Sequence, residues 1–262
     1  MPVFDVIHDH TKIGPLYAGS ILRLPLVVTN HSPFEGSHNT LFTAIRRWCS
    51  IVAISEAQAA GATGPVTVVK NGVDTDFYNA GPGCGDADGP YLLFIGRFEE
   101  VKGAHVAATV ARKAGWRLII AGRLGKESER NYFRDRLQPL LGDDIRYIGE
   151  IDKVNKRRLL QQASALLNPI SWNEPFGLTM VEALSCGTPV IAYGRGAAVE
   201  IVQDGVTGLL CTTEDELVQA CQQIPQLSRE EARAKAVEHF GLDRMALGYI
   251  DAYQRAIRVS GR

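Results

Sequence analysis

Two glutamates with seven residues between them flank the start of an expected helix. Glu174 precedes the expected helix over residues 176–185, and Glu182 lies within it. A helical rise of 1.5 Å per residue separates the two by at most ~12 Å, about the reach from a hexose to a ribose across a diphosphate. Carboxylates accept hydrogen bonds from hydroxyls, so one could bind the hexose and the other the ribose. The spacing therefore predicts a site for a sugar nucleotide.

Phosphate-binding groups accompany the two carboxylates. Pro175 and Gly177 open the helix, whose first backbone N–H groups lack helical partners and lie at the positive end of the dipole. Upstream, Arg97 and Lys102 follow an expected strand of a parallel sheet, where ligands bind. The guanidinium can form paired hydrogen bonds to a diphosphate, and the ammonium adds a point charge. These groups could together hold the phosphates between the two sugars.

The residues after Glu182 extend this pattern into a longer motif. The stretch ALSCGTPVIAYGRGAAVEIVQDGVTGLL, residues 183–210, adds small residues, Gly-x-Pro-Val and a glycine-rich turn. The whole pattern resembles the signature of the retaining glycosyltransferases of family 4 (group 1), which have the GT-B fold. The resemblance covers nearly the whole chain and implies an α/β protein with two Rossmann-like, doubly wound domains. It also implies transfer of a hexosyl group from a nucleotide-diphosphate sugar to an acceptor, with retention of configuration and without a metal or other cofactor.

The same resemblance implies roles for individual residues. Arg97 and Lys102 match the diphosphate-binding pair and would be electrostatic catalysts, while Glu174 would hold the sugar. Glu182 would hold the ribose, and His31, after the apolar stretch LVVT, would lie beside the transferred sugar. The other residues expected to contact the donor are Gly96, Phe176, Gly177 and Leu178 near the sugar and phosphates, and Ile151 and Lys156 near the nucleobase.

Composition excludes several classes of protein. The chain has 28 Lys and Arg against 29 Asp and Glu, so no basic excess indicates a nucleic-acid partner. No apolar run reaches the length of a membrane span, and the first residues lack the layout of a signal peptide. Five cysteines without a CxxC pair favour reduced thiols. We therefore expect a cytoplasmic protein of carbohydrate biosynthesis, with peripheral attachment to a membrane as an alternative.

Short apolar strands alternating with helices predict two parallel α/β units. In the first unit the expected strands are residues 4–8, 26–29, 51–54 and 66–69, and the expected helices are 13–22, 39–49 and 55–60. In the second unit the expected strands are residues 91–96, 117–121, 145–148, 165–168, 189–192 and 208–210. The expected domains are residues 1–78, a Gly/Pro/Asp-rich linker 79–90, residues 91–241, and a C-terminal segment 242–262 whose helix packs toward the first domain.

The first domain is expected to be incomplete. By the resemblance, on the order of eighty residues of the family's N-terminal domain are missing, about half an average domain. The strand over residues 4–8 would then present an open edge, which favours self-association. His8 and His10 share a face of this strand and could bind a metal, but the sequence offers no third ligand, so none is expected. The helical stretch LFTAIRRW, residues 41–48, is expected to pack internally rather than touch a membrane.

Two other functions remain open. A nucleotide-sugar 2-epimerase has the same fold, and would convert the donor alone without an acceptor. A non-catalytic module would bind the nucleotide sugar without transferring it. The sequence does not identify the base, the sugar or the acceptor, which could be a sugar, a lipid or a small molecule.

Overall fold

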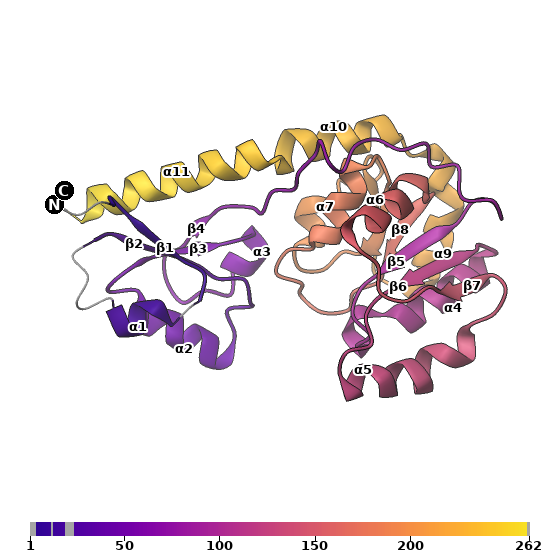
Figure 1. Cartoon of the computed structure of the whole chain (residues 1–262), viewed down its shortest axis with the longest axis horizontal. Coiled ribbons are helices and arrows are strands. Elements are labelled where there is room, and N and C mark those ends of the chain that lie inside the picture. The colour runs from indigo at the N-terminus through magenta and orange to yellow at the C-terminus, as the bar shows by residue number, and fades with distance from the viewer. Residues whose placement is uncertain (1–3, 12, 19–23, 261–262) are drawn as a thin grey trace. The chain divides into compact units, whose positions relative to one another are not determined.

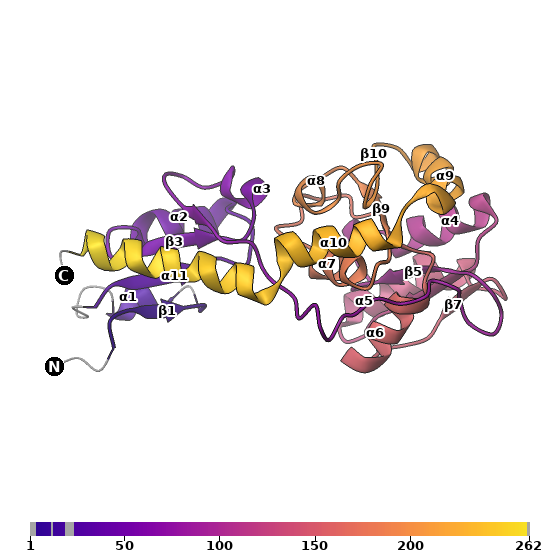
Figure 2. The ribbon, with the colours of Figure 1, turned by 90° about the horizontal axis from the view of Figure 1, so that it is seen from above.

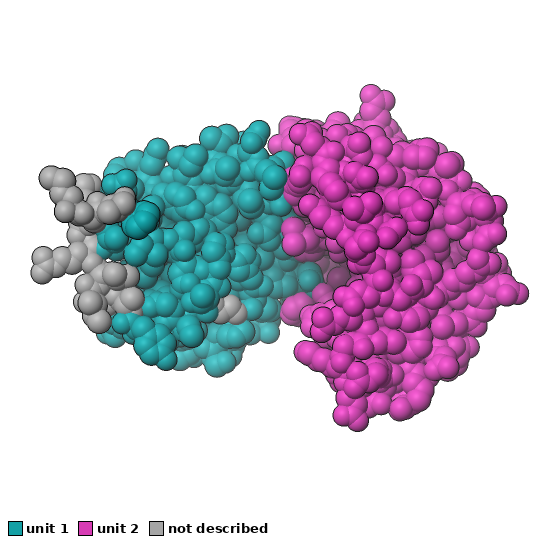
Figure 3. All heavy atoms as spheres, viewed as in Figure 1, with its two compact units in different colours: residues 1–72, 173–176, 240–262 teal, residues 73–172, 177–239 magenta. Residues whose placement is uncertain are grey.

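The computed structural model describes residues 4–11, 13–18 and 24–260. It divides into two compact units, shown in Figure 3. Unit 1 comprises residues 1–72, 173–176 and 240–262, and unit 2 comprises residues 73–172 and 177–239. Each unit contains a parallel β-sheet with helices, so the expected α/β class with two Rossmann-like units is confirmed.

In its described residues, unit 1 has a sheet of four parallel strands in the order β1-β2-β3-β4. The strands are β1 (Ile7–Asp9), β2 (Leu26–Thr29), β3 (Ser50–Ala53) and β4 (Thr67–Val68). The helices between them are α1 (Gly14–Ala18), α2 (Gly36–Ile45) and α3 (Glu56–Ala59). β1 is an edge strand of this sheet, and self-association through it stays a prediction.

The two faces of this sheet are buried by different helices. One face packs against α2, with the core residues Leu26, Val28, Ile51, Ala53, Phe34, Phe42 and Ile45. The other face packs against α11 (Leu242–Val259), with the core residues Val27, Val52, Val69, Ala252 and Ala256. Figures 1 and 2 show α11 along one side of the sheet, and α1 and α2 on the other. Burial on both faces explains why β2 and β3 are apolar at almost every position.

Unit 2 contains a six-stranded parallel sheet in the order β10-β9-β8-β5-β6-β7. The strands are β5 (Leu92–Ile95), β6 (Leu118–Ala121), β7 (Ile145–Tyr147), β8 (Ala165–Asn168), β9 (Val190–Tyr193) and β10 (Gly208–Cys211). Counted from β5, this is the doubly wound order 3-2-1-4-5-6, whose direction reverses between β5 and β8. Ligands of such sheets bind beyond the carboxyl ends of the strands at the reversal.

Helices cover both faces of the sheet of unit 2 (Figure 1). On one face α4 (Ala104–Ala114) and α9 (Glu214–Gln223) pack together over the main apolar core. On the other, α7 (Leu178–Ser185) contacts β8 and β9, and α6 (Lys153–Gln162) packs against α7. The remaining elements are α5 (Glu127–Tyr132), α8 (Ala198–Ile201), α10 (Arg229–Phe240) and the short turns η1 (Glu100–Lys102), η2 (Phe133–Leu137), η3 (Gln138–Leu140) and η4 (Ile224–Gln226).

Several element boundaries differ from those expected. The strand expected over residues 4–8 is Ile7–Asp9, and the helix expected over 39–49 is Gly36–Ile45. Residues 19–22 of the helix expected over 13–22 lie outside the described residues, and the described part contains the helix Gly14–Ala18. The helix expected from residue 176 begins at Leu178, because Gly177 has φ 124° and is not helical.

Residues 79–90 also differ from expectation, because they lie within unit 2 rather than between the units. Gly81, Gly83 and Gly85 each donate a backbone N–H to a carbonyl of this unit, those of Cys186, Gln161 and Gln162. Gly/Pro composition indicates flexibility in a linker. Here glycine instead allows close approach, since a Cβ on Gly81 would lie 2.2 Å from the Cβ of Gln161. The boundary between the units falls after Gly72.

Candidate functional site

The chain segments that follow β5 and β8 are joined at the reversal of strand order. Ser171 donates its backbone N–H to the carbonyl of Val101, at 2.9 Å. Gly103, between η1 and α4, has φ 74°, and a Cβ there would lie 2.4 Å from the carbonyl oxygen of Pro169. Only glycine combines a left-handed conformation with this approach at low cost. Glycine at position 103 thus allows these two segments to approach each other closely.

Lys102 is held in this junction. It ends η1 and is only 9% exposed, and its Nζ lies 5.4 Å from the ring centroid of Trp172. The electron-rich face of an indole attracts an ammonium group, more strongly when water is excluded. Lys102 is therefore a positioned charge in the region where doubly wound sheets bind their ligands, and its contact with a diphosphate stays a prediction.

Arg97 has a different environment. Its side chain is 55% exposed, and Nη1 donates to Oε1 of Glu99 at 2.7 Å. Exposed ion pairs contribute at most about 1 kcal/mol, so exchanging Glu99 for a phosphate would cost little. Arg97 follows Gly96 directly after β5, close to the junction in sequence, but the structure does not fix its guanidinium as it fixes Lys102.

A row of glycines ends three adjacent strands of unit 2. Gly96 follows β5, Gly122 follows β6 and Gly149 lies beyond β7. Gly122 donates its N–H to the carbonyl of Gly149 at 3.0 Å, and a Cβ on Gly122 would lie 2.2 Å from the oxygen of Gly96. The three glycines therefore leave only backbone atoms at these positions beyond the strands. Gly149 has φ 87°, and Ile151, expected near the nucleobase, is partly buried just beyond it.

Glu182 lies at the centre of a small polar cluster in unit 2. It is 8% exposed on the second turn of α7. Tyr78 donates its hydroxyl to Oε1 at 2.9 Å, and Lys156 of α6 forms an ion pair with Oε2. Burial, with the neighbouring carboxylate, raises the pKa of Tyr78, so its hydroxyl stays protonated and donates. Lys156, expected near a nucleobase, is thus placed on the carboxylate that is expected to bind ribose.

Sequence reasoning does not find Tyr78. Nothing in the stretch NGVDTDFYNA, residues 71–80, marks one aromatic residue as the partner of a glutamate 104 positions later. Asp74 forms the turn that precedes it, accepting the backbone N–H of Phe77 on Oδ1 at 2.8 Å, while the Asp74 carbonyl accepts the N–H of Tyr78 at 2.9 Å. Such turns are frequent in loops and carry no functional signal by themselves. The pairing of Tyr78 with Glu182 is visible only in the packing.

The start of α7, whose backbone is expected to contact the donor, has no side-chain cap. Gly177 is the N-cap residue of the helix, and no side chain caps the helix there. Leu178, the first helical residue, is 46% exposed. No capping side chain at Gly177 occupies the first N–H groups of α7, although the N–H of Met180 donates to the carbonyl of Gly177 at 3.0 Å.

Glu174 and Phe176 lie in the short segment of unit 1 that interrupts unit 2 in the sequence. Ser55 donates its hydroxyl to the carbonyl of Pro175 at 2.6 Å, and Phe176 is 4% exposed, with its ring centroid 6.1 Å from that of Phe240. Glu174 is partly buried in this segment. The structure therefore assigns Glu174 and Glu182 to different units.

His31 follows β2 and belongs to a cluster of three histidines in unit 1. Its Nε2 lies 2.8 Å from Nδ1 of His10, and the two rings are stacked with centroids 5.2 Å apart. His8 is engaged at both ring nitrogens, with Nδ1 2.8 Å from the hydroxyl of Tyr253 and Nε2 2.8 Å from that of Thr29. Within the described residues, no group of three or more His, Cys, Asp or Glu is arranged to hold a metal ion.

The surroundings of His8 predict a dependence of stability on pH. Burial lowers the pKa of His8 to about 4, with His10 and His31 lowering it further and Asp9 opposing them. An unfolded histidine titrates near 6.5. Between about pH 6.5 and 4 the unfolded chain therefore takes up a proton that the folded chain does not, and stability falls as the pH falls.

We expect the free energy of unfolding, measured with urea from pH 7.5 to 4.5, to fall more steeply for the wild type than for His8→Gln. His239→Gln is the control, because His239 is a surface residue paired with Glu238. If the free energy of unfolding falls equally steeply with pH in the wild type and His8→Gln, His8 is not the source of this pH dependence.

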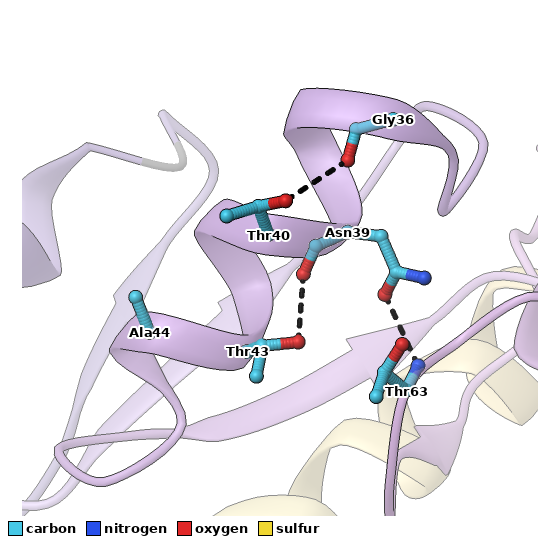
Figure 4. A pocket seen from close by; sticks show the side chains of 6 residues that line it. All are labelled: Gly36, Asn39, Thr40, Thr43, Ala44 and Thr63. Atoms are coloured by element: carbon cyan, nitrogen blue, oxygen red, sulfur yellow. Dashed lines mark hydrogen bonds between the residues drawn. The ribbon is translucent and has the colours of Figure 1, made fainter.

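An open hollow of about 490 Å³ lies beside α2 in unit 1 (Figure 4). Its lining residues are Gly36, Asn39, Thr40, Thr43, Ala44 and Thr63. The hydroxyls of Thr40 and Thr43 donate to helix carbonyls, and Asn39 accepts the N–H of Thr63. The lining contains no charged residue and none of the residues expected to bind the donor, so we assign it no role.

In the described part of the chain, no helix is both long and apolar enough to cross a membrane.

Comparison with known proteins identifies the family. The family model described as "Glycosyl transferases group 1" matches residues 85–239, more than half of the chain. Its range includes most of unit 2, with Lys102, the glycine row and Glu182. The chain is 29% identical over 242 residues to a protein named glycogen synthase from Mycobacterium tuberculosis, covering 80% of this chain. It spans 57% of the length of that relative.

Solved structures agree on the fold. Sucrose-phosphate synthase from Thermosynechococcus elongatus aligns with a TM-score of 0.84 at 20% identity, covering 98% of this chain and 74% of that one. HepE from Anabaena, solved in complex with UDP and glucose, aligns with a TM-score of 0.80 at 22% identity, covering 96% of this chain and 78% of that one. Both are similar to this chain in fold, which is that of GT-B glycosyltransferases. Taken with the family match, these findings show that the chain belongs to the group 1 glycosyl transferases.

Proposed function

We propose that the chain is a retaining glycosyltransferase of family 4 that moves a hexosyl group from a nucleotide-diphosphate sugar to an acceptor. The observation that carries the proposal is that unit 2 contains both a buried lysine, Lys102, at the reversal of strand order and a buried, oriented glutamate, Glu182, on α7. The similarity to a protein solved with UDP and glucose, and to one named glycogen synthase, supports a nucleotide-sugar donor.

The proposed reaction breaks the bond between the anomeric carbon and the diphosphate oxygen, whose electron pair leaves with the diphosphate. Lys102, Arg97 and the N–H groups at the start of α7, near Gly177 and Leu178, stabilise the charge that develops on this leaving group. The sugar gains oxocarbenium character, as in glycoside chemistry. The acceptor hydroxyl attacks on the face that the diphosphate leaves, and its proton passes to the departing phosphate. No metal ion or other cofactor takes part in this scheme.

The remaining residues would bind and orient the donor. We assign Glu182 to the ribose hydroxyls, and Ile151 and Lys156 to the neighbourhood of the nucleobase. Glu174 and the backbone near Gly96 and Phe176 would hold the hexose, and His31 would lie beside its reacting end. The acceptor, the identity of the base and a cytoplasmic location belong to this proposal as well.

Binding and turnover test the proposal separately. A thermal-shift screen against UDP-, GDP- and ADP-sugars should raise the melting temperature with at least one donor, because a ligand that binds only the folded state stabilises it. Glu182→Ala should then weaken nucleotide binding by about 1–3 kcal/mol in calorimetry, through loss of charged hydrogen bonds. Glu230→Ala is the control, because Glu230 is exposed on α10.

The outcomes distinguish three functions. Release of the nucleoside diphosphate together with a glycosylated acceptor supports the transferase. Conversion of the donor to its epimer, without an acceptor, would indicate an epimerase. Binding without either reaction would indicate a non-catalytic binding module, and equal affinity of the wild type and Glu182→Ala would overturn the ribose assignment.

A further inference from the structure

The carboxylate of Glu182 lies where three segments of unit 2 meet. It projects from α7, Lys156 reaches it from α6, and Tyr78 reaches it from the segment before β5. The two partners hold different oxygens, Tyr78 on Oε1 and Lys156 on Oε2. A carboxylate held on both oxygens cannot rotate without breaking one of these interactions.

Tyr78 is itself fixed at both ends. Its carbonyl accepts hydrogen bonds from the Ser185 hydroxyl at 2.7 Å and from Nη1 of Arg233 at 3.0 Å. Ser185 lies three residues after Glu182 on the same helix, so Tyr78 spans about one turn of α7. The residue is 4% exposed, and its ring packs edge-on against that of Phe77, with centroids 5.0 Å apart. The hydroxyl therefore has one position relative to the helix.

The carboxylate retains acceptor capacity. Two carboxylate oxygens offer about four lone-pair directions. In the described residues, Tyr78 takes one on Oε1, whereas Oε2 is buried beside Lys156 in an ion pair and accepts no hydrogen bond. The carboxylate therefore retains acceptor capacity, and a buried oxygen without a hydrogen-bond donor is one that a ligand hydroxyl would satisfy.

We propose that Tyr78 is a positioning residue, which orients the carboxylate of Glu182 to accept the 2′- and 3′-hydroxyls of a ribose. The inference rests on the proposed function, because it presupposes that a nucleotide binds at Glu182. It goes beyond that function in assigning the selectivity for a ribose diol to a tyrosine outside the donor motif. Without the phenol, Lys156 alone would hold the carboxylate, which could turn about its last side-chain bond.

The test compares Tyr78→Phe with the wild type on ribose and dideoxyribose ligands. We measure the affinities of UDP, GDP and ADP and of their 2′,3′-dideoxy analogues by calorimetry. The wild type should prefer the ribose form of the nucleotide that it binds. Tyr78→Phe should lose about 5- to 20-fold in affinity for that ribose form, a typical effect of one charged hydrogen bond. Its affinity for the dideoxy form should change by less than about twofold.

Tyr91→Phe is the matched control. Tyr91 is also a buried tyrosine of unit 2, and its hydroxyl donates to the carbonyl of Leu159 at 2.9 Å, away from Glu182. Loss of this hydroxyl should lower the melting temperature and leave the preference for ribose unchanged. A purely structural role for Tyr78 predicts the same pattern in Tyr78→Phe, or an equal loss for both ligand forms, and either result overturns the inference. If the wild type binds none of the three nucleotides, the proposed function fails and the inference fails with it.

Discussion

Lys102→Ala is expected to lower the rate of nucleoside diphosphate release by about 10²- to 10³-fold, the usual effect of removing one group that stabilises a developing negative charge. Charge on the leaving diphosphate grows toward the transition state, so the donor affinity should fall much less than the rate. Lys102 is buried against Trp172, which makes its charge effective. Arg97→Ala should also lower the rate of release, but by less, because Arg97 is half exposed and paired with Glu99.

Single-turnover rates with a saturating donor, together with donor affinities from calorimetry, measure these effects. Lys113→Ala provides the control, since Lys113 is an exposed lysine on α4 that pairs with Glu214. Its rate and affinity should match those of the wild type. An unchanged rate in Lys102→Ala with a weaker affinity would show that Lys102 binds the donor without assisting the reaction.

Arg229→Ala is expected to lower the free energy of unfolding by about 3–5 kcal/mol, because several buried acceptors lose their donor together. The guanidinium of Arg229, on α10, joins three parts of unit 2. Its acceptors are the carbonyls of Gly81, Gln161, Ala163 and Cys186 and the hydroxyl of Thr188. Desolvation lowers the pKa of Arg229, which is the cost of burying the charge, and these five acceptors offset it.

Urea denaturation followed by tryptophan fluorescence would measure the loss. Lys235→Ala is the matched control on the same helix, because Lys235 forms an exposed ion pair with Glu238. The free energy of unfolding of Lys235→Ala should stay within about 0.5 kcal/mol of that of the wild type. A loss of less than about 1 kcal/mol in Arg229→Ala would mean that water replaces the guanidinium at these carbonyls.

Most of the fold could be predicted because the strands of both units are short, apolar and buried on two faces. The strands Leu26–Thr29 and Ala165–Asn168 agree with the prediction at both ends. Errors fell where a conformation depends on one residue, as at Gly177, or where composition suggested flexibility, as in residues 79–90. The order of the strands was not predicted, because register and crossover depend on packing between distant segments.

The candidate site could be predicted only in part. The motif singled out Lys102 and Glu182, and the structure shows both side chains buried, while their roles in donor binding stay predictions. The partners of these residues could not be found, because Trp172 and Tyr78 reach them from other segments. His10 was considered only with His8, whose ring centroid lies 4.1 Å from its own, whereas the structure also brings it to His31, on the loop after the neighbouring strand.

The packing of α11 on the sheet of unit 1 has a consequence for biosynthesis. Val27, Val52 and Val69 leave the ribosome long before Ala252 and Ala256, which cover them in the finished protein. At about 5–20 residues per second, the 183 residues from Val69 to Ala252 take on the order of 10–40 s to translate. During this interval one apolar face of the nascent sheet is without its final cover, while the residues of unit 2 up to His239 are made first. This face of β2 and β3 is therefore buried long after the strands are synthesised, and a chaperone that shields them would act on this face.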